Sequence, residues 1–187
     1  MRLPGWVLVF MVIAGVLFAL KILYVAAAGF VLPLTRGGLF VGTPGPRIAA
    51  FLDNIYMGPG TLLVDLGCGD GRVLRAARRR YGVRAIGFEI NPLAYGVARL
   101  LSLGRAGITI RYANFWKEDL RRADVVFCYL FPDLMTGLAE KLKRELRPGC
   151  TVVSCNFPLP GWKAKRVLRP DHSRHGDPVY IYEILRM

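Results

Sequence analysis

Hydrophobic positions divide the chain into one long unbroken apolar run and a region where short apolar and amphipathic stretches alternate. Residues 6–34 carry Lys21 as their only charge, whereas charged and apolar residues interleave after residue 46. An apolar run of this length is sufficient to span a bilayer as a helix. The pattern predicts an N-terminal membrane segment at 1–34, a Gly/Pro-rich connector at 35–46 and a folded domain at 47–187.

The domain region alternates between predicted strands and helices. Helices are predicted at 47–56, 71–82, 91–104 and 132–149, where apolar residues recur at helical spacing and Gly or Pro-Gly stands at most of the ends. Apolar runs predict strands at 61–66, 83–90, 108–113, 123–130 and 150–157. Strands separated by helices form a parallel sheet covered on both faces, which indicates an α/β fold. Strands at 163–168 and 179–186 are separated only by a loop and predict a C-terminal antiparallel hairpin.

The apolar N-terminal run is interpreted as a retained membrane anchor. A lysine at mid-membrane costs about 2.5–3.5 kcal/mol, but Lys21 lies toward one end, and each Leu, Ile, Val or Phe returns roughly 0.3–0.6 kcal/mol. A cleaved signal peptide, with a small-residue site at 26–29, and a helix buried against the domain are the alternatives. Only Arg2 precedes the run, while Arg36 and Arg47 follow it, which places the domain on the cytoplasmic side of a single-pass protein.

A formal net charge of +13 indicates an anionic partner or surface without choosing among nucleic acid, phospholipid and acidic protein. The arginines between residues 72 and 84 are interpreted as the solvated face of a helix. The four cysteines lack metal-ligand spacing and favour a reducing compartment. His172 and His175 are assigned to a polar loop, because no third ligand lies at suitable spacing, and no metal site is predicted.

The stretch VDLGCGDGR at residues 64–72 places three glycines and two aspartates directly after a predicted strand. Glycines permit positive φ and remove the Cβ atoms that would keep a ligand from the backbone, and the following helix offers free N–H groups. In a parallel sheet, ligands bind at such carboxyl ends of strands. Asp65 and Asp70 make the loop unsuited to a pyrophosphate and suited to a cation such as a sulfonium or an ammonium group. Glu89 then ends the second strand, where it can accept hydrogen bonds from ribose hydroxyls.

Taken together, VDLGCGDGR and GFEINP resemble the first two motifs of class I S-adenosylmethionine-dependent methyltransferases. The resemblance implies a Rossmann-like, mostly parallel sheet and S-adenosylmethionine as the cofactor. It implies that Asp65, Gly67 and Gly69 contact the amino-acid end of the cofactor. It also implies that Glu89 contacts the ribose and Asn114 the adenine, although many members of the superfamily have an acidic residue where this chain has Asn114. The full set of residues expected to bind the cofactor is Asp65, Gly67, Cys68, Gly69, Asp70, Glu89, Asn114, Phe115 and Tyr129.

Four further stretches narrow the resemblance: FVGTP, NFWKEDL, YLFPDLM and ELRPGCTVVSCNFPLPGW. Together they look like the membrane-associated protein-lysine methyltransferases, whose animal members act on the ATP synthase c-subunit and the adenine nucleotide translocase. The resemblance covers residues 40–162, and Cys68 departs from the serine expected there. Enzymes that methylate the amino groups of bases or of glutamine usually carry Asn or Asp where this chain has Tyr129. This difference counts against a methylase that acts on the amino nitrogen of a base.

The methyl acceptor is expected to enter a channel with aromatic walls, since aromatic faces attract ammonium groups. Candidate channel residues are Tyr129, Phe131 and Asp133. Phe157 and Trp162 are further wall candidates with an equal or better interpretation as packing residues, and Asp133 also suits the first turn of a helix.

These features predict a protein-lysine N-methyltransferase that acts on a membrane protein, with anionic lipid headgroups as a fitting contact for its basic residues. An RNA or other nucleic-acid methyltransferase, a lipid or quinone methyltransferase, and a non-catalytic membrane-bound binding module are the alternatives. The N-terminal run and the missing Asn-Pro-Pro-type motif count against nucleic acid.

Overall fold

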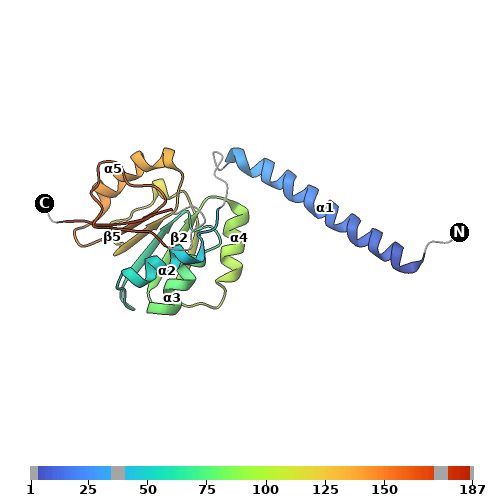
Figure 1. The fold of residues 1–187 in the computed structure, drawn as a ribbon, viewed down its shortest axis with the longest axis horizontal. Helices are drawn as coiled ribbons and strands as arrows, with labels where there is room; N and C mark the ends of the chain where they lie inside the picture. Colours follow the sequence, from blue (N-terminus) through green and yellow to red (C-terminus); the bar gives the residue numbers. More distant parts are fainter. Residues whose placement is uncertain (1–3, 35–40, 171–176, 186–187) are drawn as a thin grey trace. The chain divides into compact units, whose positions relative to one another are not determined.

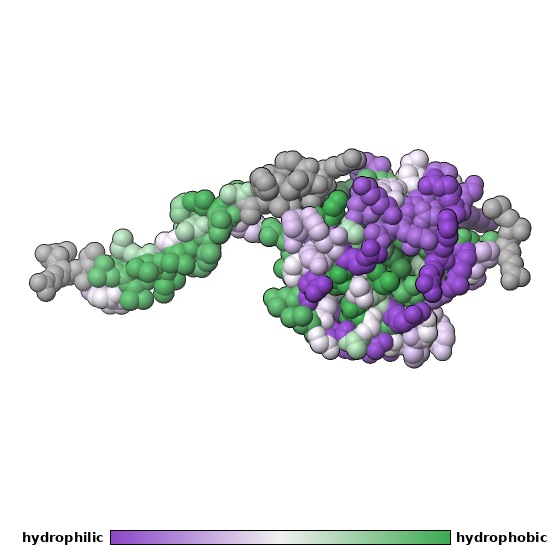
Figure 2. Space-filling model, turned by 180° about the vertical axis from the view of Figure 1, so that it is seen from behind, coloured by the Kyte–Doolittle hydropathy of each residue, from purple (hydrophilic) through white to green (hydrophobic). Residues whose placement is uncertain are grey.

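The computed structural model describes residues 4–34, 41–170 and 177–185, which belong to two compact units, Met1–Leu39 and Phe40–Met187. The first unit contributes the helix α1 (Gly5–Leu34), whose segment Gly5–Ala26 is long and apolar enough to cross a membrane. At 1.5 Å per residue this segment is about 33 Å long, close to the thickness of a bilayer core. Lys21 is its only charged residue, and the face seen in Figure 2 is mostly apolar.

The second unit alternates strands and helices as the sequence predicts. Its helices are α2 (Gly45–Asn54), α3 (Arg72–Tyr81), α4 (Pro92–Leu101) and α5 (Met135–Glu145), with short 3₁₀ turns η1 (Phe115–Lys117) and η2 (Pro132–Leu134). Its strands are β1 (Leu62–Leu66), β2 (Arg84–Glu89), β3 (Ile108–Tyr112), β4 (Val125–Cys128), β5 (Thr151–Cys155), β6 (Arg166–Leu168) and β7 (Val179–Glu183).

All seven strands form one sheet in the order β3-β2-β1-β4-β5-β7-β6. The first five are parallel, and β7 pairs antiparallel with both β5 and β6. The predicted mostly parallel sheet with a C-terminal antiparallel hairpin is therefore confirmed. Strand order reverses between β1 and β4, which is where ligands bind in sheets of this kind.

Helices cover both faces of the sheet, as predicted (Figure 1). Apolar residues of α2, α3 and α4, such as Phe51, Leu74 and Ala98, share a core with one face. The opposite face packs against α5 through Leu138 and Leu142. Because each central strand meets helices on both sides, nearly every residue of β1 and all of β4 are buried.

Several helix boundaries differ from the sequence prediction. Helix α2 begins at Gly45, inside the predicted connector, and ends at Asn54, two residues before the predicted end. Helix α4 ends at Leu101 rather than Gly104, because the chain leaves the helix at Ser102 and turns before Gly104 takes up its positive φ of 70°. The predicted helix at 132–149 is split into η2 and α5, with Pro132 opening the 3₁₀ turn. Helix α3 ends as predicted, with Gly82 in the left-handed conformation at its C-cap.

Gly87 in the middle of β2 permits the closest packing in the core. A Cβ atom at this position would stand 2.6 Å from both Cys68 Sγ and Leu74 Cδ1, which is far inside van der Waals contact. The missing side chain lets Cys68 and α3 approach the strand. Glycine is therefore required here for packing and not for an unusual backbone conformation.

We expect Gly87→Ala to lower the free energy of unfolding by about 1–3 kcal/mol, because the added methyl group overpacks the core. Gly96 in α4 offers a matched control, since a Cβ there meets nothing within 4 Å. Gly96→Ala should instead stabilise the domain by roughly 0.5–1 kcal/mol through reduced backbone entropy. Denaturant unfolding of the full chain in detergent, followed by tryptophan fluorescence, measures both; equal stability of the two variants would contradict the packing argument.

Candidate functional site

A tight glycine loop connects β1 to α3 at the edge of the sheet where strand order reverses. Gly67, Gly69 and Gly71 have φ values of 76°, 54° and 77°, which L side chains rarely adopt. The backbone N–H groups of Gly67 and Cys68 both donate to Phe88 O, at 2.9 and 3.0 Å. The loop is thus fastened to the end of β2 by its own main chain.

A narrow hollow opens beside this loop. It is lined by Val41, Gly42, Thr43, Asp65, Gly67, Cys68, Gly69, Asp70, Arg72 and Tyr129. The structure therefore brings six of the predicted cofactor residues together in one place. Glu89 is joined to them, since its carboxylate accepts a hydrogen bond from Gly69 N.

Asp65 lies near the end of β1 with 2% of its surface exposed. Burial, and then the neighbouring carboxylates of Glu89 and Asp70, raise its pKa well above the ordinary value. Within the described part of the chain, no hydrogen bond to this carboxylate offsets the loss of solvation. A buried carboxylate in this state favours a cationic ligand, because the ligand would supply the missing charge.

Glu89 is 8% exposed, and its two oxygens are already engaged. Oε2 accepts from Gly69 N at 2.8 Å, and Oε1 accepts from Ile90 N at 2.9 Å and Asn91 N at 2.8 Å. A carboxylate offers about four acceptor positions, so these bonds leave one for an incoming hydroxyl. Binding two ribose hydroxyls, as the sequence predicts, requires one backbone bond to be shared or displaced.

Asp70 has a different environment from Asp65. Its carboxylate accepts hydrogen bonds from Arg72 Nε at 3.0 Å and Arg72 Nη2 at 2.8 Å. Partial burial alone would raise the pKa of Asp70, but the hydrogen bonds and charge of Arg72 lower it below its ordinary value. The charge of Asp70 is therefore already compensated within the protein.

Cys68 contributes its backbone to the hollow, whereas its side chain belongs to the core. The thiol packs toward Gly87 and is buried, and burial is the largest cause that raises its pKa, followed by Asp65 and Glu89. Cys68, which we expected to bind the cofactor, can therefore contact it only through its main chain.

The end of β3 lies beside the end of β2, since Ala113 N donates to Glu89 O at 3.0 Å. Asn114 follows and caps η1, its Oδ1 accepting from Trp116 N at 3.1 Å. The ring of Phe115 packs against Trp116 with centroids 4.9 Å apart. Asn114, predicted to meet adenine, and Phe115, predicted to bind the cofactor, therefore follow a strand that lies beside the one that carries Glu89.

Of the predicted acceptor residues, only Tyr129 lines the hollow. It follows β4 directly, one strand away from Asp65. Phe131 is 42% exposed, and Asp133 is exposed in the short turn η2. Phe157 and Trp162 are half-buried against the core, with Trp162 edge-on to Tyr182 at 5.7 Å, which supports their interpretation as packing residues. His172 and His175 lie outside the described residues.

Two parts of the site were not predicted. The segment 41–43 lines the hollow, where Arg72 Nη1 donates to Thr43 O at 3.4 Å and a Cβ on Gly42 would meet the Arg72 guanidinium at 2.7 Å. Arg47, 3% exposed, places its guanidinium 5.1 Å from the centroid of the Tyr129 ring and forms an ion pair with Asp177. For the first, the sequence signals were the Gly/Pro-rich composition of the connector and the stretch FVGTP in the family resemblance. For the second, a basic residue in a predicted amphipathic helix gave no signal.

Comparison with known proteins identifies this arrangement. The family model described as the ANTKMT methyltransferase domain matches residues 65–166. A protein-lysine N-methyltransferase of Saccharolobus islandicus (strain REY15A) is 33% identical over 150 residues, which cover 78% of this chain and 92% of that protein. An adenine nucleotide translocase lysine N-methyltransferase of Mus musculus is 36% identical over 81% of this chain and 66% of its own length. A lysine N-methyltransferase of the ATP synthase c-subunit from Xenopus laevis is 31% identical over 92% of this chain and 75% of its own length.

A solved structure agrees with the fold and with the cofactor. The crystal structure of an RNA methyltransferase from Salinibacter ruber in complex with S-adenosyl-L-homocysteine matches with a TM-score of 0.71 and 32% identity, covering 79% of this chain and 95% of that chain. S-adenosylhomocysteine is what remains of S-adenosylmethionine after its methyl group has been transferred. The chain belongs to the ANTKMT methyltransferase domain family, and it is an S-adenosylmethionine-dependent methyltransferase.

Proposed function

We propose that the chain is a protein-lysine N-methyltransferase that acts on a membrane protein, with α1 as a single-pass anchor and the domain on the cytoplasmic side. The observation that carries the lysine assignment is Tyr129 beside the glycine loop, an aromatic ring at the methyl-transfer end of the site in place of an amide or acid. Aromatic faces attract ammonium groups by about 0.5–2 kcal/mol. The names of the relatives from Saccharolobus islandicus, Mus musculus and Xenopus laevis support the same acceptor.

The residues of the hollow fit the cofactor of the family. When bound, S-adenosylmethionine supplies a methyl group on a positively charged sulfur. Asp65 is assigned to the cationic amino-acid end, because its buried carboxylate lacks a compensating charge. The backbone of Gly67 and Gly69 would cradle the same end, and Glu89, which already accepts from Gly69 N, would accept from a ribose hydroxyl. Asn114 and Phe115 are assigned to adenine.

The acceptor side is organised around Tyr129. Arg47 covers one face of this ring and is itself held by Asp177, so the ring is fixed in orientation. The part of Tyr129 that lines the hollow is assigned to the incoming lysine. Phe131 and Asp133 are exposed and are assigned to the rim, where they would contact the protein segment that carries the lysine. Holding nitrogen, methyl carbon and sulfur in line is worth roughly 7–11 kcal/mol in such reactions.

Anchoring through α1 would confine enzyme and target to the same thin layer. This raises their effective concentration without any additional contact. The segment Gly5–Ala26 has the length and composition for it, and relatives are named for components of membrane-bound machinery.

RNA methylation is the second candidate. It is favoured by the name of the Salinibacter ruber protein and by the arginines of α3, and disfavoured by Tyr129 in place of the amide or acid of amino-nitrogen base methylases. If the arginines of α3 bind the phosphates of RNA, the affinity for RNA should fall steeply as the salt concentration rises.

We expect Asp65→Asn to weaken binding of S-adenosylmethionine by roughly 10- to 100-fold, because a hydrogen bond to a charged group is lost. The same substitution should stabilise the ligand-free protein at neutral pH. The pKa of Asp65 is higher in the folded state than its ordinary value of 3.8. The folded protein therefore loses stability as the pH rises from 3.8 to this higher pKa, because the buried carboxyl group must ionise. The amide avoids this cost, and thermal unfolding against pH measures the gain.

Asp119→Asn serves as the matched control, since Asp119 is exposed and lies outside the hollow. It should leave both properties unchanged. Below pH 3.8 the stability gain of Asp65→Asn should vanish. A variant that binds cofactor normally, or that is less stable at neutral pH, would show that Asp65 has a purely structural role.

The acceptor class is tested with purified full-length protein in detergent, tritiated S-adenosylmethionine and membranes from its own source, separated into protein, lipid and RNA fractions. We expect label in a protein band, on lysine by mass spectrometry. Glu89→Ala should abolish the label, because the substitution removes both the ribose acceptor and the bond that holds Gly69.

Label confined to RNA or to lipid would refute the lysine assignment and identify the alternative acceptor. Absence of label in every fraction, together with measurable cofactor binding, would favour a binding module without catalytic activity.

A further inference from the structure

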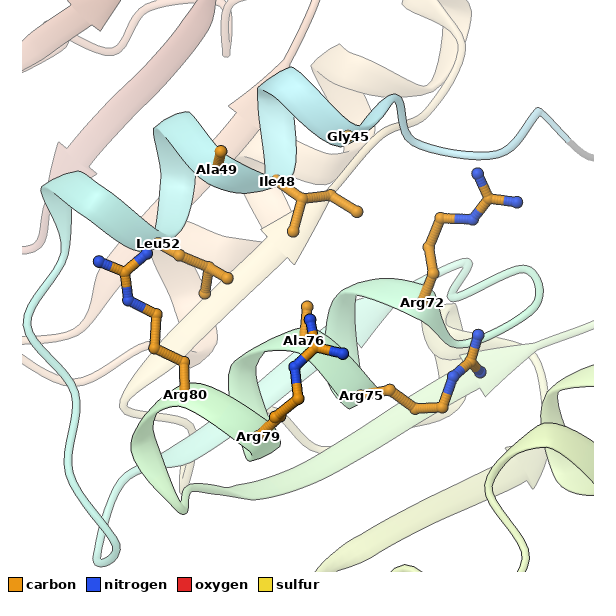
Figure 3. A pocket seen from close by; sticks show the side chains of 9 residues that line it. All are labelled: Gly45, Ile48, Ala49, Leu52, Arg72, Arg75, Ala76, Arg79 and Arg80. Atoms are coloured by element: carbon orange, nitrogen blue, oxygen red, sulfur yellow. The ribbon is translucent and has the colours of Figure 1, made fainter.

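A basic groove runs between α2 and α3, on the face of the domain next to the glycine loop (Figure 3). Its volume is about 690 Å³. Ile48 and Leu52 point from α2 toward α3 and form its apolar floor. Arg72, Arg75, Arg79 and Arg80 of α3 form its rim.

The rim carries more positive charge than its acids neutralise. Arg72 pairs with Asp70 and Arg80 pairs with Asp53, whereas Arg75 and Arg79 have no carboxylate partner within the described residues. Partial burial, opposed by Asp70 and reinforced by Arg105 and Arg72, lowers the pKa of Arg75. Because burial is the largest of these causes, an anion in the groove would supply the favourable interaction that the Arg75 guanidinium loses with water.

The arginines of α3 lie on the side of the helix away from the core, as predicted, since its buried residues are Val73, Leu74 and Ala77. Arg79 and Arg80 are exposed, but Arg72, Arg75 and Arg78 are half-buried. Arg75 Nη1 donates to Asp70 O, and Arg78 Nη1 donates to Val83 O at 3.0 Å. Their guanidinium groups are therefore held in place by the backbone and do not extend freely into water.

The lining favours a phosphate that is joined to an apolar group. Guanidinium groups bind phosphate oxygens in a planar, bidentate manner. A free phosphate or a nucleic-acid backbone would satisfy the arginines without using the apolar floor of Ile48 and Leu52. A phospholipid uses both, through its headgroup and the start of its acyl chains.

The chain also limits how far this groove can lie from the end of α1. Gly45, the first residue of α2, lines the groove, and residues 35–44 connect it to Leu34. Ten residues span at most about 36 Å. If α1 crosses the bilayer, Gly45 at one end of the groove is therefore tethered within about this distance of Leu34.

We infer that the groove between α2 and α3 binds an anionic phospholipid and docks the domain onto the leaflet. This inference rests on the proposed insertion of α1, and it adds a second, electrostatic contact with the membrane. The groove shares Arg72 with the hollow beside the glycine loop, so docking fixes the orientation of the site relative to the lipid surface.

The test uses the full chain reconstituted in nanodiscs of phosphatidylcholine, alone or mixed with phosphatidylglycerol. Hydrogen exchange of the α2 and α3 amides is followed by mass spectrometry. Because each basic residue near an anionic surface contributes about a fivefold preference, we expect at least about fivefold slower exchange with phosphatidylglycerol. Arg79→Glu should remove this protection, because it reverses the charge of a rim arginine that is exposed and has no carboxylate partner among the described residues. Arg122→Glu, an equal charge change at an exposed site outside the groove, should retain it.

Equal exchange in the two lipid mixtures would overturn the inference. So would equal loss of protection in Arg79→Glu and Arg122→Glu, which would indicate attraction by net charge alone. Stronger protection by RNA in pure phosphatidylcholine discs would assign the groove to nucleic acid instead. Methyl transfer measured in the phosphatidylcholine discs reports on the proposed function separately, since it requires no anionic lipid.

Discussion

The attachment of the glycine loop to the end of β2 is the constraint on which the cofactor end of the site depends. Phe88 O accepts from two successive amides of the loop, and the carboxylate of Glu89 accepts from Gly69 N. Gly87 makes this approach sterically feasible, because any side chain there would collide with Cys68. The loop therefore lines the hollow chiefly with backbone. It also brings Glu89 close enough to Asp65 for their charges to interact.

Much of the fold could be predicted from the apolar runs and from the glycines and prolines that end them. Each central strand is a short apolar run because it is buried on both faces, and Gly82 marks the end of α3 as expected. The order within the C-terminal hairpin also follows from composition, since β7 is largely buried whereas β6 is exposed at the edge. Helix ends were less accessible to prediction. Helix α4 ends before Ser102 and not at Gly104, where its end was predicted, and Pro132 begins a separate 3₁₀ turn.

The candidate site was predictable where chemistry coincides with the end of a parallel strand. Asp65, Glu89, Asn114 and Tyr129 all satisfy that condition. Arg47 does not, because its position depends on Asp177, which lies 130 residues further along the chain. Periodicity carries no information on a contact of that separation. The segment 41–43 enters the site for a similar reason, through its contact with Arg72.

The two aspartates of VDLGCGDGR show what the fold adds to a motif. In the sequence Asp65 precedes the glycines, Asp70 lies between Gly69 and Gly71, and both acids suit a cation. In the structure Asp70 is compensated by Arg72, which lowers its pKa, whereas Asp65 is buried beside two other carboxylates, which raises its pKa. The Coulomb energy gained by a ligand cation is greatest where the protein has left a charge uncompensated and poorly solvated. We therefore assign recognition of positive charge to Asp65 in the proposed function, while Asp70 connects the glycine loop to the first residue of α3 and to the basic groove beside it.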